Sequence, residues 1–236
     1  MAKKTAATSH MDRTERVAGT IFFVVYLLVM PLLLERLFSL VETLLGTRVE
    51  PGLRGALYYY FLFVVTLLIF YRFVALTTSR FFDNPGRSCV DLFFSMLVFY
   101  GANELMYRVL SLFFGSRPNL NDTVIVAQID AVPRTTALIV IFIAPFVEEV
   151  LFRGLVFGCL KEASRPAAYV VSAALVSLLH VWTFPLWQWS LTYFILTLQY
   201  LVPGLVFAWA FDRSGTLWTS ILLHAIVNAL ALYVIL

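Results

Sequence analysis

The longest uncharged stretch of the chain, residues 166–211, limits the possible folds more than any other feature. It contains no Asp, Glu, Lys or Arg, and a helix needs only about 20 apolar residues to cross the hydrocarbon core of a bilayer. The stretch is therefore long enough for two membrane spans and must fold back once. We expect the reversal at Pro185, which interrupts the helix among three tryptophans, a residue type of membrane interfaces: Trp182, Trp187 and Trp189.

The composition of the whole chain agrees with a bilayer as its solvent. Of 236 residues, 61% are hydrophobic and 13% are charged, whereas about a quarter of the residues of a soluble domain are charged. The net charge of +3 is too small to indicate a nucleic-acid partner. We therefore predict an all-α, polytopic transmembrane helical bundle of about seven spans, with membrane lipids as its partners and no separate soluble catalytic domain.

The chain divides into three parts. The first ten residues, ahead of Met11, are typical of an expression leader, and the fold prediction leaves them out. An N-terminal transmembrane region of three spans follows, and the last part is a core of four spans. These parts cover residues 1–10, 11–134 and 135–236, and the first three spans are expected at 17–34, 55–71 and 90–114.

The distribution of Lys and Arg predicts the orientation in the membrane. These residues are more frequent at the N-terminus and in the second, fourth and sixth loops than in the other loops, and positive residues favour the cytoplasmic side. The sequence therefore predicts an integral, multi-pass protein of the cell (plasma) membrane with a cytoplasmic N-terminus. A short link is expected at the segment KEASRP after the fourth span, and the last break before the C-terminal span is expected at the segment FDRSG.

The fourth span, at 135–160, keeps three ionisable residues in the membrane, where each costs on the order of 3 kcal/mol. Glu148 and Glu149 are adjacent, so they point about 100° apart and need different partners. Glu149 and Arg153 have the i,i+4 spacing of an intrahelical ion pair, which leaves Glu148 without a local counter-ion, as suits a general base. Glu104 and Arg108 have the same spacing in the third span, and for this pair we favour a purely structural role.

Further polar candidates lie on two other spans. At a rise of 1.5 Å per residue, Glu148, His180 and His224 all lie roughly 12 to 20 Å from the inner membrane surface. His224 and Asn228 share one helix face, so an imidazole and an amide can point together at one oxygen atom. Three helices thus carry polar groups at a similar depth, which predicts a water-filled cavity between them.

These residues form motifs that resemble those of the CAAX protease and bacteriocin-processing family, also called the Abi or CAAX prenyl protease 2 family. The motifs are Glu148-Glu149-x-x-x-Arg153, His180 at the end of VSLLH, and His224-x-x-x-Asn228, and they agree in order and spacing over roughly residues 137–231. One position departs from the family pattern, since Val176 stands where the family usually has Phe. The first three spans show no resemblance.

The resemblance implies an intramembrane endopeptidase with residues 135–236 as its catalytic, Abi-type core. Glu148 would be the general base, and His180 would orient the water or protonate the leaving amine. His224 and Asn228 would stabilise the oxyanion, while Glu149 and Arg153 would hold the cavity in shape. No cofactor is expected, although two His and one Glu can make a three-ligand zinc site, so a divalent metal stays open.

The sequence does not identify the substrate. The resemblance implies a hydrophobic protein or peptide, and it leaves open whether that substrate is lipidated or membrane-anchored. Two alternatives are a non-catalytic peptide-binding or immunity-type membrane scaffold and a transporter, but the chain lacks the internal repeat of a transporter. A haem protein with two axial histidines is a further alternative, in which the pair of glutamates has no obvious use.

Overall fold

The computed structural model describes residues 11–115, 132–181 and 197–235, with isolated positions at 125, 126, 128, 129 and 195. Within these residues all regular structure is helical, as predicted. The expected leader, and the reversal at Pro185 with its three tryptophans, lie outside the described residues.

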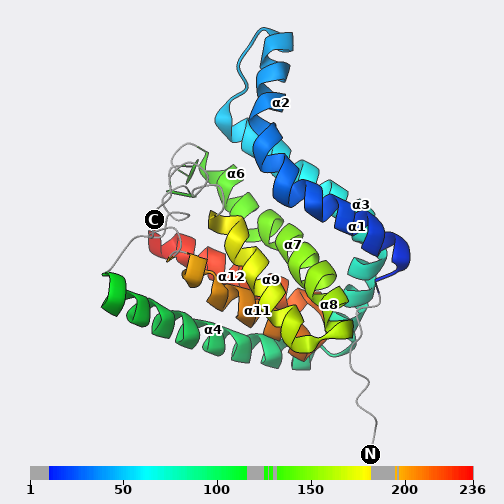
Figure 1. Ribbon diagram of the computed structural model, residues 1–236, viewed down its shortest axis with the longest axis vertical. Helices are drawn as coiled ribbons and strands as arrows, with labels where there is room; N and C mark the ends of the chain where they lie inside the picture. Colours follow the sequence, from blue (N-terminus) through cyan, green and yellow to red (C-terminus); the bar gives the residue numbers. More distant parts are fainter. Residues whose placement is uncertain are drawn as a thin grey trace, which may run out of the picture.

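The helices of the described residues join into seven rods (Figure 1), in agreement with the predicted bundle. Five of the rods are long and apolar enough to cross a membrane, whereas α9 and α11 are shorter. Three of the segments within the rods are π-helical turns, labelled η. In chain order the rods are α1 (Arg13–Val24), η1 (Val25–Val29) and α2 (Met30–Leu45); α3 (Pro51–Asp83); α4 (Pro85–Phe114); α6 (Pro133–Leu138), η2 (Ile139–Ile143), α7 (Ala144–Glu149), η3 (Val150–Phe157) and α8 (Gly158–Ala163); α9 (Arg165–Val181); α11 (Leu201–Ser214); and α12 (Leu217–Ile235).

The first two helices are longer than the predicted spans. The first continues beyond residue 34 to Leu45, so Glu35 and Arg36 lie within α2 and not in a loop. Its final part contains no buried residue, and α2 projects from the bundle beside the start of α3 (Figure 1). The uncharged runs predicted helices that are too short, because a helix can carry charged residues in the turns that extend beyond the hydrocarbon core.

Two of the predicted helix breaks lie where the sequence placed them. Ser164, within KEASRP, has an extended backbone and separates α8 from α9. Gly215, within FDRSG, has φ 74° after the end of α11, a left-handed conformation that costs glycine little. Short links of this kind make consecutive rods antiparallel neighbours.

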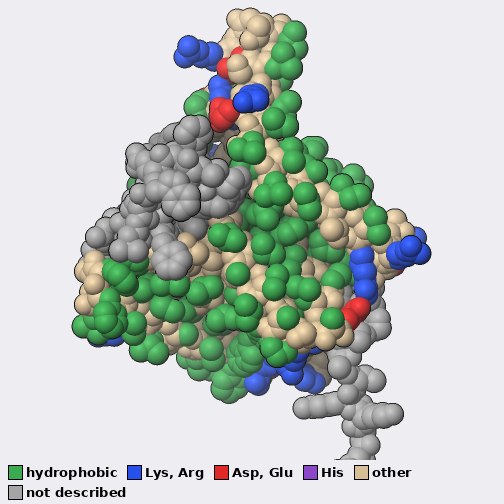
Figure 2. All heavy atoms as spheres, in the orientation of Figure 1, with side chains coloured by type: hydrophobic (Ala, Val, Ile, Leu, Met, Phe, Trp, Pro, Cys, Tyr) green, Lys and Arg blue, Asp and Glu red, His purple; other side chains and the backbone are tan. Residues whose placement is uncertain are grey.

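The fourth rod, from α6 to α8, lies at the centre of the bundle. In its most apolar window 61% of the residues are buried, compared with 17–28% for the first three rods. The other rods present many hydrophobic side chains outward, and Figure 2 shows that such side chains dominate the surface of one face. A close approach of α9 and α11 completes the core, because Gly204 leaves no room for a Cβ, which would lie 2.8 Å from the Ala173 Cα.

One end of the bundle is held by ion pairs between rods. Arg16 of α1 binds Glu162 of α8 at 2.6 Å, and Arg165 of α9 binds Asp212 of α11 at 2.6 Å. At the start of α1, the Asp12 carboxylate accepts a hydrogen bond from the Glu15 backbone N–H, which lowers the pKa of Asp12. These contacts fix the start of α1 beside the end of the fourth rod, so the two rods run antiparallel.

Candidate active site

The predicted polar residues of the fourth rod lie among irregular helical turns. Of the π-helical turns in the described residues, η2 and η3 lie on either side of α7, which carries Glu148 and Glu149. π-helical turns often mark functional sites, because they shift the backbone hydrogen bonds by one residue. One consequence is seen at Val140 in η2, whose carbonyl accepts a hydrogen bond from the Asn228 side chain of α12 (2.8 Å).

Glu149 and Arg153 form the ion pair that their spacing predicted. The Arg153 Nη1 lies 3.1 Å from the Glu149 Oε1, and both side chains are 0% exposed. Arg153 also donates from Nη2 to the carbonyls of Pro203 (3.3 Å) and Gly204 (3.1 Å), so it joins the fourth rod to α11. A buried charge needs such a set of partners, because an unpaired one is strongly destabilising.

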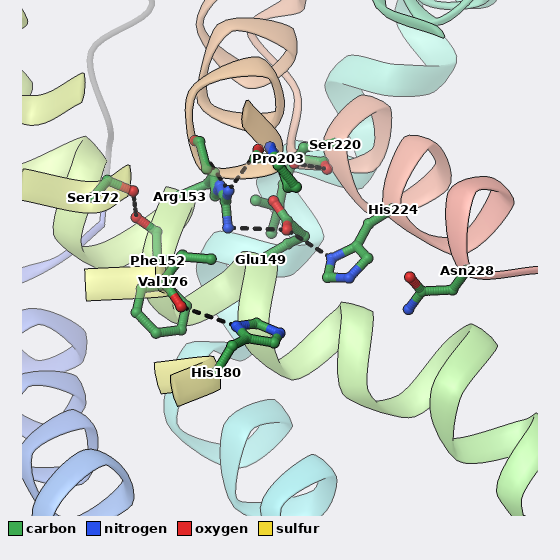
Figure 3. Close-up of polar contacts among 12 residues, drawn as sticks. Glu149, Phe152, Arg153, Ser172, Val176, His180, Pro203, Ser220, His224 and Asn228 are labelled. Atoms are coloured by element: carbon green, nitrogen blue, oxygen red, sulfur yellow. Dashed lines mark hydrogen bonds and ion pairs between the residues drawn. The ribbon is translucent and has the colours of Figure 1, made fainter. Parts of the chain in front are cut away.

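Glu149 has a second partner that the sequence pattern does not predict. The His224 Nδ1 lies 2.9 Å from the same Glu149 Oε1 (Figure 3). A carboxylate accepts, so Nδ1 carries the hydrogen, and Nε2 can donate as well only when the imidazole is protonated. No local signal could have revealed this contact, because 75 residues separate the two side chains along the chain.

Glu148 has a different environment from its neighbour. Its side chain is half-buried, and its Oε2 is buried and accepts no hydrogen bond from the described residues. The Glu149 Oε2 is also buried without a hydrogen-bond partner, but its Oε1 binds Arg153 and His224. The two adjacent glutamates therefore differ as their 100° separation predicted, because Glu148 forms no hydrogen bond or ion pair with the described residues. An unused buried acceptor in a native protein calls for an explanation, and a functional role is one.

His180 is oriented by its own helix. Its Nδ1 lies 2.9 Å from the Val176 carbonyl, which can only accept, so Nδ1 carries the hydrogen and Nε2 keeps a lone pair. The imidazole stacks on the Tyr200 ring, with 4.3 Å between centroids and 19° between planes. Both contacts hold the ring in one position, with Nε2 available for a further partner.

The packing of α9 on the fourth rod brings His180 towards the level of Glu148. The Ser172 hydroxyl donates to the Phe152 carbonyl (3.1 Å), and the two rods run antiparallel across the link at Ser164. Measured from this contact, His180 lies about 12 Å further along α9. Glu148 lies about 6 Å from the same contact along the fourth rod, in the same direction. Side chains lean towards the start of their own helix, so His180 and Glu148 lean towards each other.

His224 and Asn228 share one face of α12, but their hydrogen bonds do not converge on one oxygen. His224 is bound to Glu149 and Asn228 to the Val140 carbonyl. Among the described residues the two side chains therefore have no common acceptor. Within the described part of the chain, no three His, Cys, Asp or Glu side chains lie close enough together to hold a metal ion.

Comparison with known proteins agrees with the resemblance seen in the motifs. Residues 131–230 match the family model described as Type II CAAX prenyl endopeptidase Rce1-like. This range nearly coincides with the predicted one, contains all six site residues, and supports a membrane endopeptidase. No curated protein and no solved structure matches the chain.

Proposed function

We propose that this protein is an intramembrane endopeptidase in which Glu148 and His180 activate water. The observation that carries the proposal is the difference between the two adjacent glutamates. Glu149 is fully buried and binds Arg153 and His224 through its Oε1, whereas Glu148 forms no hydrogen bond or ion pair with the described residues. A carboxylate available in this way can accept the proton of a water molecule.

The reaction needs one water and no covalent enzyme intermediate. Glu148 takes a proton from the water, while the lone pair of the His180 Nε2 accepts its other hydrogen and orients the oxygen. A bond forms between this oxygen and the carbonyl carbon of the substrate, and the carbonyl oxygen becomes an oxyanion. As the bond between carbon and nitrogen breaks, Glu148 gives its proton to the leaving amine.

The oxyanion needs a donor, and His224 is our candidate. With Nδ1 held by Glu149, a protonated His224 donates from Nε2, and the Glu149 carboxylate stabilises the imidazolium. Asn228 joins it only if its amide leaves the Val140 carbonyl when substrate binds. Arg153 keeps Glu149 in place through its own contacts with α11.

The membrane location of the protein limits the class of substrate. Five candidate membrane spans and the family match support an integral membrane protein. We further propose that it lies in the cell membrane with a cytoplasmic N-terminus, because Lys and Arg are more frequent at the N-terminus and in the loops of that side. The substrate would be a hydrophobic protein or peptide, with a prenylated C-terminus as one case.

The test measures cleavage by the purified protein in lipid nanodiscs. The probes are a farnesylated peptide with a CAAX terminus and the same peptide without the lipid. We expect Glu148→Gln and His180→Ala to abolish cleavage at an unchanged melting temperature. Glu104→Gln, the same change in an exposed glutamate of α4, should retain full activity. Full activity in Glu148→Gln or His180→Ala would disprove the proposed mechanism.

A second experiment identifies natural substrates. Membranes of cells that express the wild-type chain are compared with membranes of cells that express Glu148→Gln, and the N- and C-termini of all membrane proteins are sequenced by mass spectrometry. Proteins whose termini are shortened only with the wild-type chain are substrates. Identical sets of termini would count against a peptidase.

A further inference from the structure

The N-terminal region, which shows no resemblance to the family, contributes three tyrosines near Glu148. Tyr26 lies in η1 and is 6% exposed. Tyr58 and Tyr59 are neighbours in α3, half-buried, with 5.2 Å between their ring centroids. All three pack in or against the hydrophobic cluster that contains Phe146 and Val147, directly before Glu148.

Ring contacts between α1 and η3 place Tyr26 beside Glu148. Phe23 packs edge-to-face on Phe152, with 5.3 Å between centroids. Tyr26 follows Phe23 by three residues and Glu148 precedes Phe152 by four, so each pair lies on one helix face about one turn apart. The two rods are antiparallel, and Tyr26 follows Phe23 whereas Glu148 precedes Phe152. Tyr26 therefore lies in the same direction from Phe23 as Glu148 lies from Phe152.

A second contact brings α3 to the same place. Phe63 packs on Phe146 of α7, with 5.1 Å between centroids, and Tyr59 precedes Phe63 by four residues on the same face of α3. Two rods of the N-terminal region therefore bring tyrosines to the cluster beside Glu148.

Phenol groups suit the requirements of a general base in a membrane. A phenol O–H donates to a carboxylate without carrying a positive charge, so it orients Glu148 without forming an ion pair of the kind that holds Glu149. Among the described residues no direct hydrogen bond joins these hydroxyls to Glu148. One bridging water makes the link with nearly the strength of a direct bond.

We propose that Tyr26, supported by Tyr58 and Tyr59, is a positioning residue for Glu148: its hydroxyl donates through a water to the unpartnered Oε2. The bond holds the carboxylate in one orientation, with its other oxygen directed to the water that attacks the substrate. The inference rests on the proposed function. It assigns the N-terminal region a part in the site, and η1, a π-helical turn, is the segment that presents Tyr26.

The first test removes single hydroxyls and keeps the rings. We expect Tyr26→Phe to lower kcat roughly ten-fold at unchanged KM, with a small fall in melting temperature, as the loss of a hydrogen bond to a charged group predicts. Tyr58→Phe and Tyr59→Phe should have smaller effects of the same kind. The matched control is Tyr60→Phe, because Tyr60 is the next residue of α3 and is 42% exposed. Wild-type kcat in Tyr26→Phe would overturn the proposal, since a tyrosine that only packs loses nothing in this variant.

The second test does not depend on peptidase activity. The change in melting temperature caused by Tyr26→Phe is measured in the wild-type chain and in Glu148→Gln. Two side chains linked through water should give non-additive changes, whereas independent ones add. Additive changes in a chain that cleaves the peptide would overturn the tyrosine proposal alone. Non-additive changes in a chain that cleaves nothing would overturn the proposed function and leave the link between Tyr26 and Glu148 supported.

Discussion

Two pairs with the same sequence pattern, Glu-x-x-x-Arg, have opposite environments in this molecule. In α4, Glu104 and Arg108 lie 2.7 Å apart, and their side chains are 57% and 72% exposed. In the fourth rod, Glu149 and Arg153 lie 3.1 Å apart, and both are 0% exposed. The spacing formed an ion pair in both helices, so local sequence alone does not distinguish a surface pair from a central one.

The difference lies in the further partners of each pair. Arg153 reaches two carbonyls of α11 and Glu149 reaches His224, so one pair connects three rods. Glu104 and Arg108, in contrast, bind each other within their own helix. A charge in a core is held by its whole set of partners, whereas a surface pair contributes little to stability.

The largest expected effect is the difference in stability between variants of the two arginines. Arg153→Met leaves the buried Glu149 without its main counter-ion and should lower the free energy of unfolding by about 3–5 kcal/mol. Arg108→Met is the matched control. Unfolding of both variants in the same detergent, followed by circular dichroism, measures the difference. Equal melting of Arg153→Met and Arg108→Met would show that burial does not distinguish the pairs.

Replacing the glutamate of the buried pair should lower the free energy of unfolding less than replacing the arginine. Glu149→Gln keeps an oxygen that accepts but loses the charge that faces Arg153 and His224, so we expect a loss of about 2–3 kcal/mol. Activity on the farnesylated peptide should fall together with the melting temperature. Should activity vanish at an unchanged melting temperature, the roles of Glu148 and Glu149 would have to be exchanged.

Substitutions at two glycines test how tightly the core and α4 are packed. A Cβ at Gly204 would lie 2.8 Å from the Cα of Ala173, whereas nothing lies within 4 Å of a Cβ at Gly101 in α4. Gly204→Ala should therefore cost about 1–3 kcal/mol, and Gly101→Ala should be neutral or stabilising by up to about 1 kcal/mol. Thermal unfolding of both variants provides the measurement. A neutral Gly204→Ala would mean that α9 and α11 separate easily.

The smallest expected effect concerns the exposed pair itself. Glu104→Gln should change the free energy of unfolding by only about 0.3–0.5 kcal/mol, the typical value of an i,i+4 pair on a helix surface. The melting temperature of this variant, measured beside Glu149→Gln, completes the comparison. A loss as large as that of Glu149→Gln would indicate that α4 binds a further partner through this pair.

Much of the fold followed from patterns that are local in the chain. Uncharged runs predicted membrane helices, because a charge in the hydrocarbon core is costly. The breaks at Ser164 and Gly215 were predicted from short polar segments. The ends of the first helices were misplaced, since a charge marks the end of the apolar stretch and not the end of the helix, as Glu35 within α2 shows.

The features of the site can likewise be separated into those that local sequence specifies and those that it does not. The i,i+4 pairing of Glu149 with Arg153 depends only on helix geometry, which the sequence specifies. Other features depend on how separate rods pack: the contact between His224 and Glu149, the hydrogen bond from Asn228 to the Val140 carbonyl, and the tyrosines near Glu148. Spacing within one helix fixes which side chains share a face, but only tertiary packing decides which face meets which neighbour.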